Sequence, residues 1–191
     1  HVDACVHWLQ GRGEQVTLTR EPGGSPLAET LRGLLLAQDM QPDTEALLAF
    51  AARSDHLQRV IRPALTAGGW VVCDRFTDST FAYQGGGSGV DTTRLAQLEA
   101  WVQGGLSPVR TYLFDLPPEV AAARRAAVRA ADRFEARELD YFARVRQTYL
   151  DRVAADPDRF VVLDATATPD VVGARLLADL AGVHARWREG A

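Results

Sequence analysis

Residues 70–76 read W-V-V-C-D-R-F, a short apolar run that ends in an acid and an arginine. Two glycines precede the run and break any helix before it. A short apolar run with such a boundary is typical of a strand that is buried on both faces of a parallel sheet. We therefore expect a fully buried strand over the first four residues, with Asp74 and Arg75 at its carboxyl end.

Three further apolar runs predict strands, and the stretches between them have the spacing of amphipathic helices. These strands are expected at 16–19, at 111–114 (also buried) and at 160–163. Helices are expected over 2–9, closed by Gly11 and Gly13, over 44–62 with a kink or new start at Pro63, from Pro117 and Pro118 onward, over 139–153, and from Thr168 and Pro169 onward. Strands that alternate with helices indicate an α/β fold with a parallel sheet.

Two further helices begin at recognisable N-caps. Ser25 precedes Pro26, and proline is favoured at the first position of a helix. This helix is expected to bury a leucine face made of Leu27, Leu31, Leu34 and Leu35. Asp91 is expected to cap the other helix, whose apolar face carries Leu95, Leu98 and Val102.

The composition is that of an ordinary globular protein. The 191 residues are 47% hydrophobic and carry a net charge of −4. This length suits a single domain over 1–191, because no repeat or linker interrupts the pattern. A mild negative charge gives no reason to expect a nucleic-acid partner. No apolar run approaches the roughly 20 residues of a membrane span, so no membrane partner is expected.

The two cysteines indicate the redox compartment. Cys5 and Cys73 lie far apart in the chain, each in an apolar stretch and without the spacing of a metal site. We expect two buried free thiols in a reducing cytosol. No charged and then apolar leader opens the sequence. The expected location is therefore cytoplasmic.

Charged residues and glycines follow two of the expected strands. T-R-E-P-G-G, residues 19–24, follows the first strand, and D-R-F, residues 74–76, follows the second. Ligands of open α/β sheets bind beyond the carboxyl ends of the strands, so these two loops are the expected site. Asp74 offers hard oxygen ligands for Mg²⁺. Arg75 offers a planar fork for phosphate oxygens.

Both loops also have a purely structural interpretation. Asp74 and Arg75 could form an ion pair that only closes the strand end. Arg20 and Glu21 could lie in a solvated turn, where the glycines merely permit a tight bend. Residue types at two strand ends do not separate these alternatives, because short motifs have a high false-positive rate.

Two helical segments carry similar alternatives. Phe50 and Arg53 lie one turn apart, so they could bind a flat base by stacking and hydrogen bonding, or be a core phenylalanine beside a surface arginine. The stretch 124–133 could be a solvated helix face or a mobile lid that closes on phosphates. Its four arginines are Arg124, Arg125, Arg129 and Arg133.

Taken together, the motifs closely resemble one family. T-R-E-P-G-G, A-A-R at 51–53, D-R-F followed by S-T-F-A-Y-Q-G-G-G, and D-R-F-E at 132–135 occur in this order. This string resembles bacterial thymidylate kinases, from about His1 to the last helix. The resemblance implies a three-layer α/β/α fold with a parallel central sheet, of the P-loop nucleoside monophosphate kinase type. It also implies a homodimer that phosphorylates dTMP to dTDP with ATP and Mg²⁺ in dTTP synthesis.

The resemblance assigns catalytic roles to residues of both loops and of a lid. Asp74 is expected to help place Mg²⁺, and Arg75 to hold the phosphates between donor and acceptor. Glu21 matches a loop acid near the reacting groups. The basic lid is expected at about 124–137, with Arg129 and Arg133 as its catalytic arginines.

A second set of residues is expected to hold dTMP. Its members are Arg20, Arg32, Phe50, Arg53, Thr80, Tyr83 and Gln84. Arg32 matches a family arginine at the dTMP phosphate, and Arg53 matches one that bonds to thymine. Phe50 is the candidate stacking ring, although many members place the aromatic residue where this chain has Ala49. The segment 80–84 matches the part that reads the base and the sugar side without a 2′-hydroxyl.

One motif of the family does not occur in these 191 residues. The family opens with a strand and a P-loop, G-x-x-x-x-G-K-[ST], whose amides and lysine hold the ATP phosphates. We expect about 20 such residues to precede His1, from a strand of about 5 residues plus the loop. Two alternatives remain at this point. One is another nucleotide kinase of the same fold, and the other is a non-catalytic module that keeps only the monophosphate site.

Overall fold

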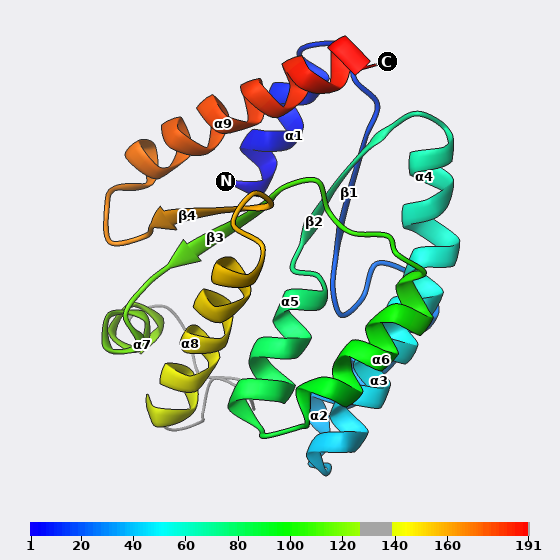
Figure 1. Cartoon of the computed structure of the whole chain (residues 1–191), viewed down its shortest axis with the longest axis vertical. Helices are drawn as coiled ribbons and strands as arrows, with labels where there is room; N and C mark the ends of the chain where they lie inside the picture. Colours follow the sequence, from blue (N-terminus) through cyan, green and yellow to red (C-terminus); the bar gives the residue numbers. More distant parts are fainter. Residues whose placement is uncertain (127–138, 191) are drawn as a thin grey trace.

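The computed structural model describes residues 1–126 and 139–190, arranged as alternating strands and helices (Figure 1). In chain order the elements are α1 (Val2–Gln10), β1 (Val16–Arg20), α2 (Pro26–Ala37), α3 (Pro42–His56), the π-helical segment η1 (Leu57–Ile61), α4 (Arg62–Thr66), β2 (Trp70–Asp74), α5 (Thr77–Thr80), the π-helical segment η2 (Phe81–Gly87), α6 (Thr92–Gln103), β3 (Thr111–Asp115), α7 (Pro118–Ala126), α8 (Leu139–Ala155), β4 (Phe160–Asp164) and α9 (Pro169–Gly190).

All the strand pairing found in the described part of the chain is parallel. β1 pairs with β2, so that Val16 lies opposite Trp70 and Arg20 opposite Asp74. β3 pairs with β4 in the same sense. The prediction of an α/β fold with parallel strands is thus confirmed. Within residues 1–126 and 139–190, however, the strands form two separate pairs and not one continuous ladder.

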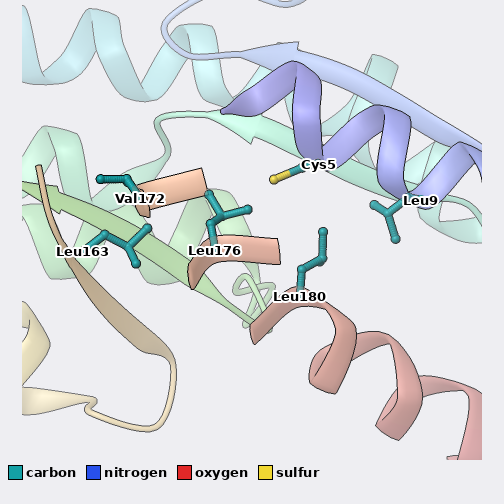
Figure 2. Packing of buried hydrophobic residues seen from close by; sticks show 6 residues of the cluster. All are labelled: Cys5, Leu9, Leu163, Val172, Leu176 and Leu180. Carbon is teal, nitrogen blue, oxygen red and sulfur yellow. The ribbon is translucent and has the colours of Figure 1, made fainter. Parts of the chain in front are cut away.

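The strands lie between two helical layers. On one face α1 and α9 pack together, and their contact carries Cys5, Leu9, Leu176 and Leu180 (Figure 2). Trp70 and Val72 of β2 pack against this cluster. Val71, which alternates with them, packs on the other face against η1. The alternation places the strand between layers, as the three-layer expectation requires.

The strands are less buried than the sequence predicted. All four residues Trp70–Cys73 are only partly buried, and Phe114 in β3 is 37% exposed. The prediction of fully buried strands is therefore wrong at both places. The reason is that each strand has one hydrogen-bonded neighbour among the described residues. A strand with a single neighbour leaves part of its side-chain surface uncovered.

Helix α2 begins as predicted but buries a different face. The Ser25 side chain accepts a hydrogen bond from the Ala28 amide, and Pro26 is the first helical residue. The buried residues are Ala28 and Leu35, whereas Leu27 and Leu34 are 51% and 44% exposed. The predicted leucine face is thus wrong for these two residues. Helix α2 packs against α3, and the stripe that carries Ala28 and Leu35 is the one buried, which leaves Leu27 and Leu34 outward.

The segment after D-R-F is helical, which the sequence analysis did not predict. It forms α5 and η2, and η2 packs directly on α8. A Cβ atom at Gly87 would collide with the ring of Tyr141, and one at Gly86 with Thr148. The Arg144 guanidinium donates to the carbonyl oxygens of both glycines, at 3.2 and 3.0 Å. The glycine run is therefore needed for the close approach of two helices.

The two cysteines are free, as expected, although they differ in burial. Cys5 is buried in the α1–α9 contact, whereas Cys73 is only partly buried. The expectation of two buried thiols is thus right for Cys5 alone. No helix within 1–126 or 139–190 is both long and apolar enough to cross a membrane.

Candidate active site

The two charged loops lie side by side at the carboxyl ends of β1 and β2. Arg20, the last residue of β1, is in register with Asp74, the last residue of β2. The next residue, Glu21, donates its backbone amide to the Asp74 carbonyl oxygen at 3.0 Å. The parallel ladder therefore joins the T-R-E-P-G-G and D-R-F loops into one surface. This is the edge at which open α/β sheets bind ligands.

Glu21 is buried and held by two residues of α3. Its side chain is 3% exposed, so the solvated-turn alternative does not describe it. Arg53 Nε donates to Glu21 Oε2 at 2.7 Å, and His56 Nδ1 lies 3.0 Å from Glu21 Oε1. Each carboxylate oxygen thus has its own partner from the same helix. Charge-assisted hydrogen bonds of this length are strong, and in a buried site they define one side-chain orientation.

Arg53 is a buried arginine, and one of its three guanidinium nitrogens has no hydrogen-bond partner among the described residues. Its Nη2 donates to Thr80 Oγ1 at 2.9 Å, which links α3 to α5. The guanidinium carbon lies 4.7 Å from the centre of the Phe50 ring and 5.3 Å from that of Phe76. Arg53 Nη1 is buried and has no hydrogen-bond partner among the described residues. A buried donor of this kind is costly unless something accepts from it, so Arg53 Nη1 is a candidate donor to a ligand.

Phe50 belongs to the hydrophobic core. It is 2% exposed and packs with Ala46, Phe81 and Leu95. Its ring also contacts the Arg53 guanidinium. The sequence left open a core phenylalanine beside a surface arginine. Phe50 is indeed a core residue, but Arg53 is buried and not on the surface. Stacking of Phe50 on a base stays a prediction.

The remainder of the T-R-E-P-G-G loop is held by Glu29, a residue that the sequence analysis did not single out. Glu29 accepts from Arg20 Nη2 and from the Gly24 amide, both at 2.9 Å. The bond from Arg20 and then that from Gly24 lower the pKa of the Glu29 carboxyl. Arg32 Nη1 donates to the Pro22 carbonyl oxygen at 2.9 Å. An acid in the first turn of a helix after a glycine loop was the available signal.

The D-R-F loop presents its two charged residues to solvent. Asp74 and Arg75 are both exposed, and Arg75 has φ of 68°. Few residues other than glycine adopt this left-handed backbone, and it is often found at functional sites. The Cys73 thiol donates to the Arg75 carbonyl oxygen at 3.0 Å, and the Tyr83 ring lies 5.1 Å from the guanidinium carbon. Burial raises the pKa of the Cys73 thiol, which keeps it protonated as a donor.

Helical segments α5 and η2 carry three of the expected dTMP-binding residues. Thr80 and Gln84 are buried, and Tyr83 is partly exposed. Gln84 Nε2 lies 3.4 Å from Oε2 of Glu45, a buried acid of α3 that the sequence analysis missed. A single acid in an amphipathic helix carries no local signal of burial.

Asp78 anchors α5 through a buried ion-pair network. It accepts from Arg152 Nε at 2.7 Å and from Arg159 Nη1 and Nη2 at 2.8 and 3.0 Å. Burial raises the pKa of the Asp78 carboxyl, but the bonds and charges of Arg159 and Arg152 outweigh this effect, so the net pKa is lowered. The network ties the site helix to α8 and to the residue before β4.

Part of the expected site lies outside the described residues. This applies to Arg129, Arg133, the D-R-F-E segment and most of the expected lid at 124–137. Arg124 is described, and its Nη1 donates to the Ala165 carbonyl oxygen at 2.8 Å. The choice between a lid and a solvated helix face stays open.

The residues described in 1–126 and 139–190 contain no cluster of three or more His, Cys, Asp or Glu side chains that could hold a metal ion. Asp74 is a single exposed carboxylate beside Arg75. Mg²⁺ is usually bound by one or two carboxylates and completes its shell with water and substrate phosphates. The Glu21 and Glu29 carboxylates of this edge are already paired with other residues. Asp74 therefore fits Mg²⁺ carried in with a nucleotide better than a metal site built from protein ligands alone.

Comparison with known proteins points to one family. The thymidylate kinase family model matches residues 1–175. A thymidylate kinase of Thiobacillus denitrificans is 56% identical over 183 residues, which cover 94% of this chain and 90% of the relative. One of Ralstonia pickettii is 60% identical over 153 residues, 80% of this chain and 75% of the relative. A crystal structure of thymidylate kinase from Ehrlichia chaffeensis matches with a TM-score of 0.74 and 30% identity, covering 93% of this chain and 89% of that one.

Proposed function

Because this chain belongs to the thymidylate kinase family, we propose that it transfers the γ-phosphoryl group of ATP to dTMP at the carboxyl ends of β1 and β2. The resemblance drawn from the sequence motifs is confirmed by the family match over residues 1–175. The observation that carries the proposal is the meeting of the T-R-E-P-G-G and D-R-F loops at one edge of the sheet. Arg53, which bonds to Glu21 of the first loop, adds a buried donor without a partner among the described residues. The alternative of a non-catalytic module is not favoured by relatives of this similarity.

The reaction needs little from the protein beyond position and charge. An oxygen of the dTMP phosphate attacks the γ-phosphorus of ATP, and the bond to the bridging oxygen of ADP breaks. The attacking oxygen is already ionised, so no general base is required. Arg75 neutralises charge on the oxygens of the phosphoryl group while that group passes from donor to acceptor. Asp74 would hold Mg²⁺ directly or through water, and the ion would neutralise phosphate charge when bound.

The acceptor is proposed to lie between α3 and the α5–η2 segment. Arg53 Nη1 supplies a donor for a carbonyl oxygen of the thymine base. Thr80, Tyr83 and Gln84 line the side where the base and the 2′-position of the sugar would be read. Arg32 lies at the other end, beside the glycine loop, where a monophosphate would be held. The product would enter dTTP synthesis, and we propose the cytoplasm as the compartment, from the two free cysteines.

Acceptor preference tests the proposal. Full-length protein, including any residues encoded before His1, is expected to phosphorylate dTMP with a higher kcat/KM than dCMP, dGMP or dAMP. The reason is that Arg53 Nη1 can donate to the 4-carbonyl oxygen of thymine, whereas cytosine carries an amino group, itself a donor, at that position. Steady-state rates with Mg·ATP and each acceptor provide the measurement. A preference for dCMP would identify another nucleotide kinase of this fold and refute the proposal.

We also propose a homodimer that uses the groove between α3 and α6. This groove, about 380 Å³ in volume, lies away from the charged loops and includes Leu47 and Trp101 in its lining. These side chains are 56% and 82% exposed, and exposed apolar groups of this size favour a partner. A second copy of the chain suits the groove because a two-fold contact places the same apolar residues of both copies against each other.

Light scattering is expected to give twice the chain mass for the wild type and the chain mass for Trp101→Glu. A monomeric wild type would contradict this.

A further inference from the structure

His56 is a buried titratable residue that the proposed phosphoryl transfer does not use. It is the last residue of α3, one turn after Arg53, and its side chain has no exposed surface. Both ring nitrogens have partners on the T-R-E-P-G-G loop. Nδ1 lies 3.0 Å from Glu21 Oε1, and Nε2 lies 2.6 Å from Thr19 Oγ1. Buried polar atoms are almost always hydrogen-bonded, and both ring nitrogens of His56 follow this rule.

The partners determine how the ring is protonated. An ionised Glu21 carboxylate can only accept hydrogen bonds, so Nδ1 of His56 carries the proton in that contact. The Thr19 hydroxyl can donate, which lets Nε2 accept. This arrangement satisfies every polar atom of the contact. It also directs the Nδ1–H of His56 at Glu21 Oε1, while Arg53 bonds to the other carboxylate oxygen, Oε2.

The His56 ring packs closely against the backbone of the loop. Gly24 packs against it, and a Cβ atom at that position would collide with His56 Nε2 and with Thr19 Oγ1. Gly24 also has φ of +85°, which places its backbone in the left-handed region. The ring is therefore enclosed by three residues of one loop, namely Thr19, Glu21 and Gly24. A shift of the ring would therefore displace these residues of the loop as well.

Glu21 in turn determines where Arg53 points. Its Oε1 bonds to His56 and its Oε2 to Arg53 Nε at 2.7 Å. Thr80 holds Arg53 Nη2. Two of the three guanidinium nitrogens are then fixed, and Nη1 is left as the buried donor without a partner among the described residues. If Glu21 rotates, Arg53 loses its Nε contact and the direction of Nη1 changes.

We propose that His56 is a positioning residue, which acts through Glu21 to aim Arg53 Nη1 at a carbonyl oxygen of the acceptor base. This rests on the proposed function, since it takes the nucleoside monophosphate as the ligand of Arg53. The His56 side chain has no exposed surface, so it is not expected to contact either substrate. Its effect is therefore on the affinity for the acceptor, and the phosphoryl-transfer step itself is left unchanged.

Three substitutions separate the two ring contacts. His56→Ala removes both, His56→Asn keeps a donor near the position of Nδ1, and His56→Gln keeps one near that of Nε2. His56→Ala is expected to raise KM for dTMP about 10-fold, the scale of a buried donor that loses its alignment. His56→Gln is expected to raise it similarly, while His56→Asn remains within about 3-fold of the wild type. In each variant kcat and KM for ATP are expected to stay near the wild-type values, because this proposal has the buried, doubly paired Glu21 act on Arg53 and acceptor binding, in place of the catalytic role that the resemblance implied.

Thr19→Val is the matched control. It removes the Nε2 contact but leaves the Nδ1–Glu21 bond, so it is expected to lower the melting temperature without raising KM for dTMP. Calorimetric titration of each variant with dTMP alone provides a measurement of binding that does not depend on turnover. Equal KM values for His56→Asn and His56→Ala would overturn the proposal, as would a fall in kcat with unchanged KM. A wild type that binds and phosphorylates another monophosphate in place of dTMP would instead refute the proposed function.

Discussion

Replacing Arg75 by alanine is expected to lower kcat by about 100-fold or more, the effect of removing one preorganised charge donor from a transition state. Arg75 follows the carboxyl end of β2, directly after Asp74, which lies across the ladder from Arg20. Its backbone is held in a left-handed conformation, with φ of 68°, and its carbonyl oxygen accepts from the Cys73 thiol. The protein therefore maintains an unfavourable backbone geometry at the position where the transferring phosphate is proposed to lie.

Three variants distinguish the guanidinium from the backbone. Arg75→Lys is expected to recover activity only in part, since a point charge cannot replace a planar fork. Arg75→Gly relieves the left-handed backbone and is expected to lose as much activity as Arg75→Ala. Arg186→Ala, which removes an exposed arginine of α9, serves as the control with unchanged kcat. Steady-state kinetics at saturating ATP and dTMP provide the measurement. If Arg75→Ala turned over at the wild-type rate, Arg75 would have no part in the transfer.

The Asp78→Ala variant is expected to lose about 3–5 kcal/mol of unfolding free energy, the range found when one partner of a buried ion pair is removed. The Asp78 side chain is 4% exposed and accepts from both Arg152 and Arg159. Arg159 is itself only 9% exposed. Without the carboxylate, its charge would remain buried beside the start of α5. The loss would be measured by urea unfolding, as a change in the midpoint at constant slope.

Asp156 offers a matched control for Asp78. It accepts from Arg159 Nε at 2.9 Å, but its side chain is 50% exposed, so Asp156→Ala is expected to cost less than about 1 kcal/mol. The pH dependence supplies a second test. The pKa of Asp78 is lowered on folding, so its stabilising effect is complete above the pKa of an unfolded aspartate, about 3.9. The effect is lost as the pH falls through the folded pKa. The difference between wild type and Asp78→Asn is therefore expected to shrink below about pH 4, and a constant difference would contradict the ion-pair account.

The sequence alone determined the local elements and the place of the site. Apolar runs of four or five residues, glycine boundaries and the caps Ser25 and Asp91 predicted the strands and helix starts. These features act over a few residues, so they can be read along the chain. The meeting of the T-R-E-P-G-G and D-R-F loops was also predictable, because parallel strands place their carboxyl ends at one edge of a sheet.

The tertiary structure decided which side chains are buried and with which partners. Nothing near Glu21 in the chain predicts that Arg53 and His56, 32 and 35 residues away, hold its two oxygens. The same applies to Asp78 and Arg159, which are 81 residues apart. In α2, the leucines at 27 and 34 have the spacing of a buried face, yet Ala28 and Leu35 occupy it. Residue spacing defines the stripes of a helix, but only the packing of another element selects the stripe that is buried. Pairings between distant segments follow from that packing, and for this reason no local pattern records them.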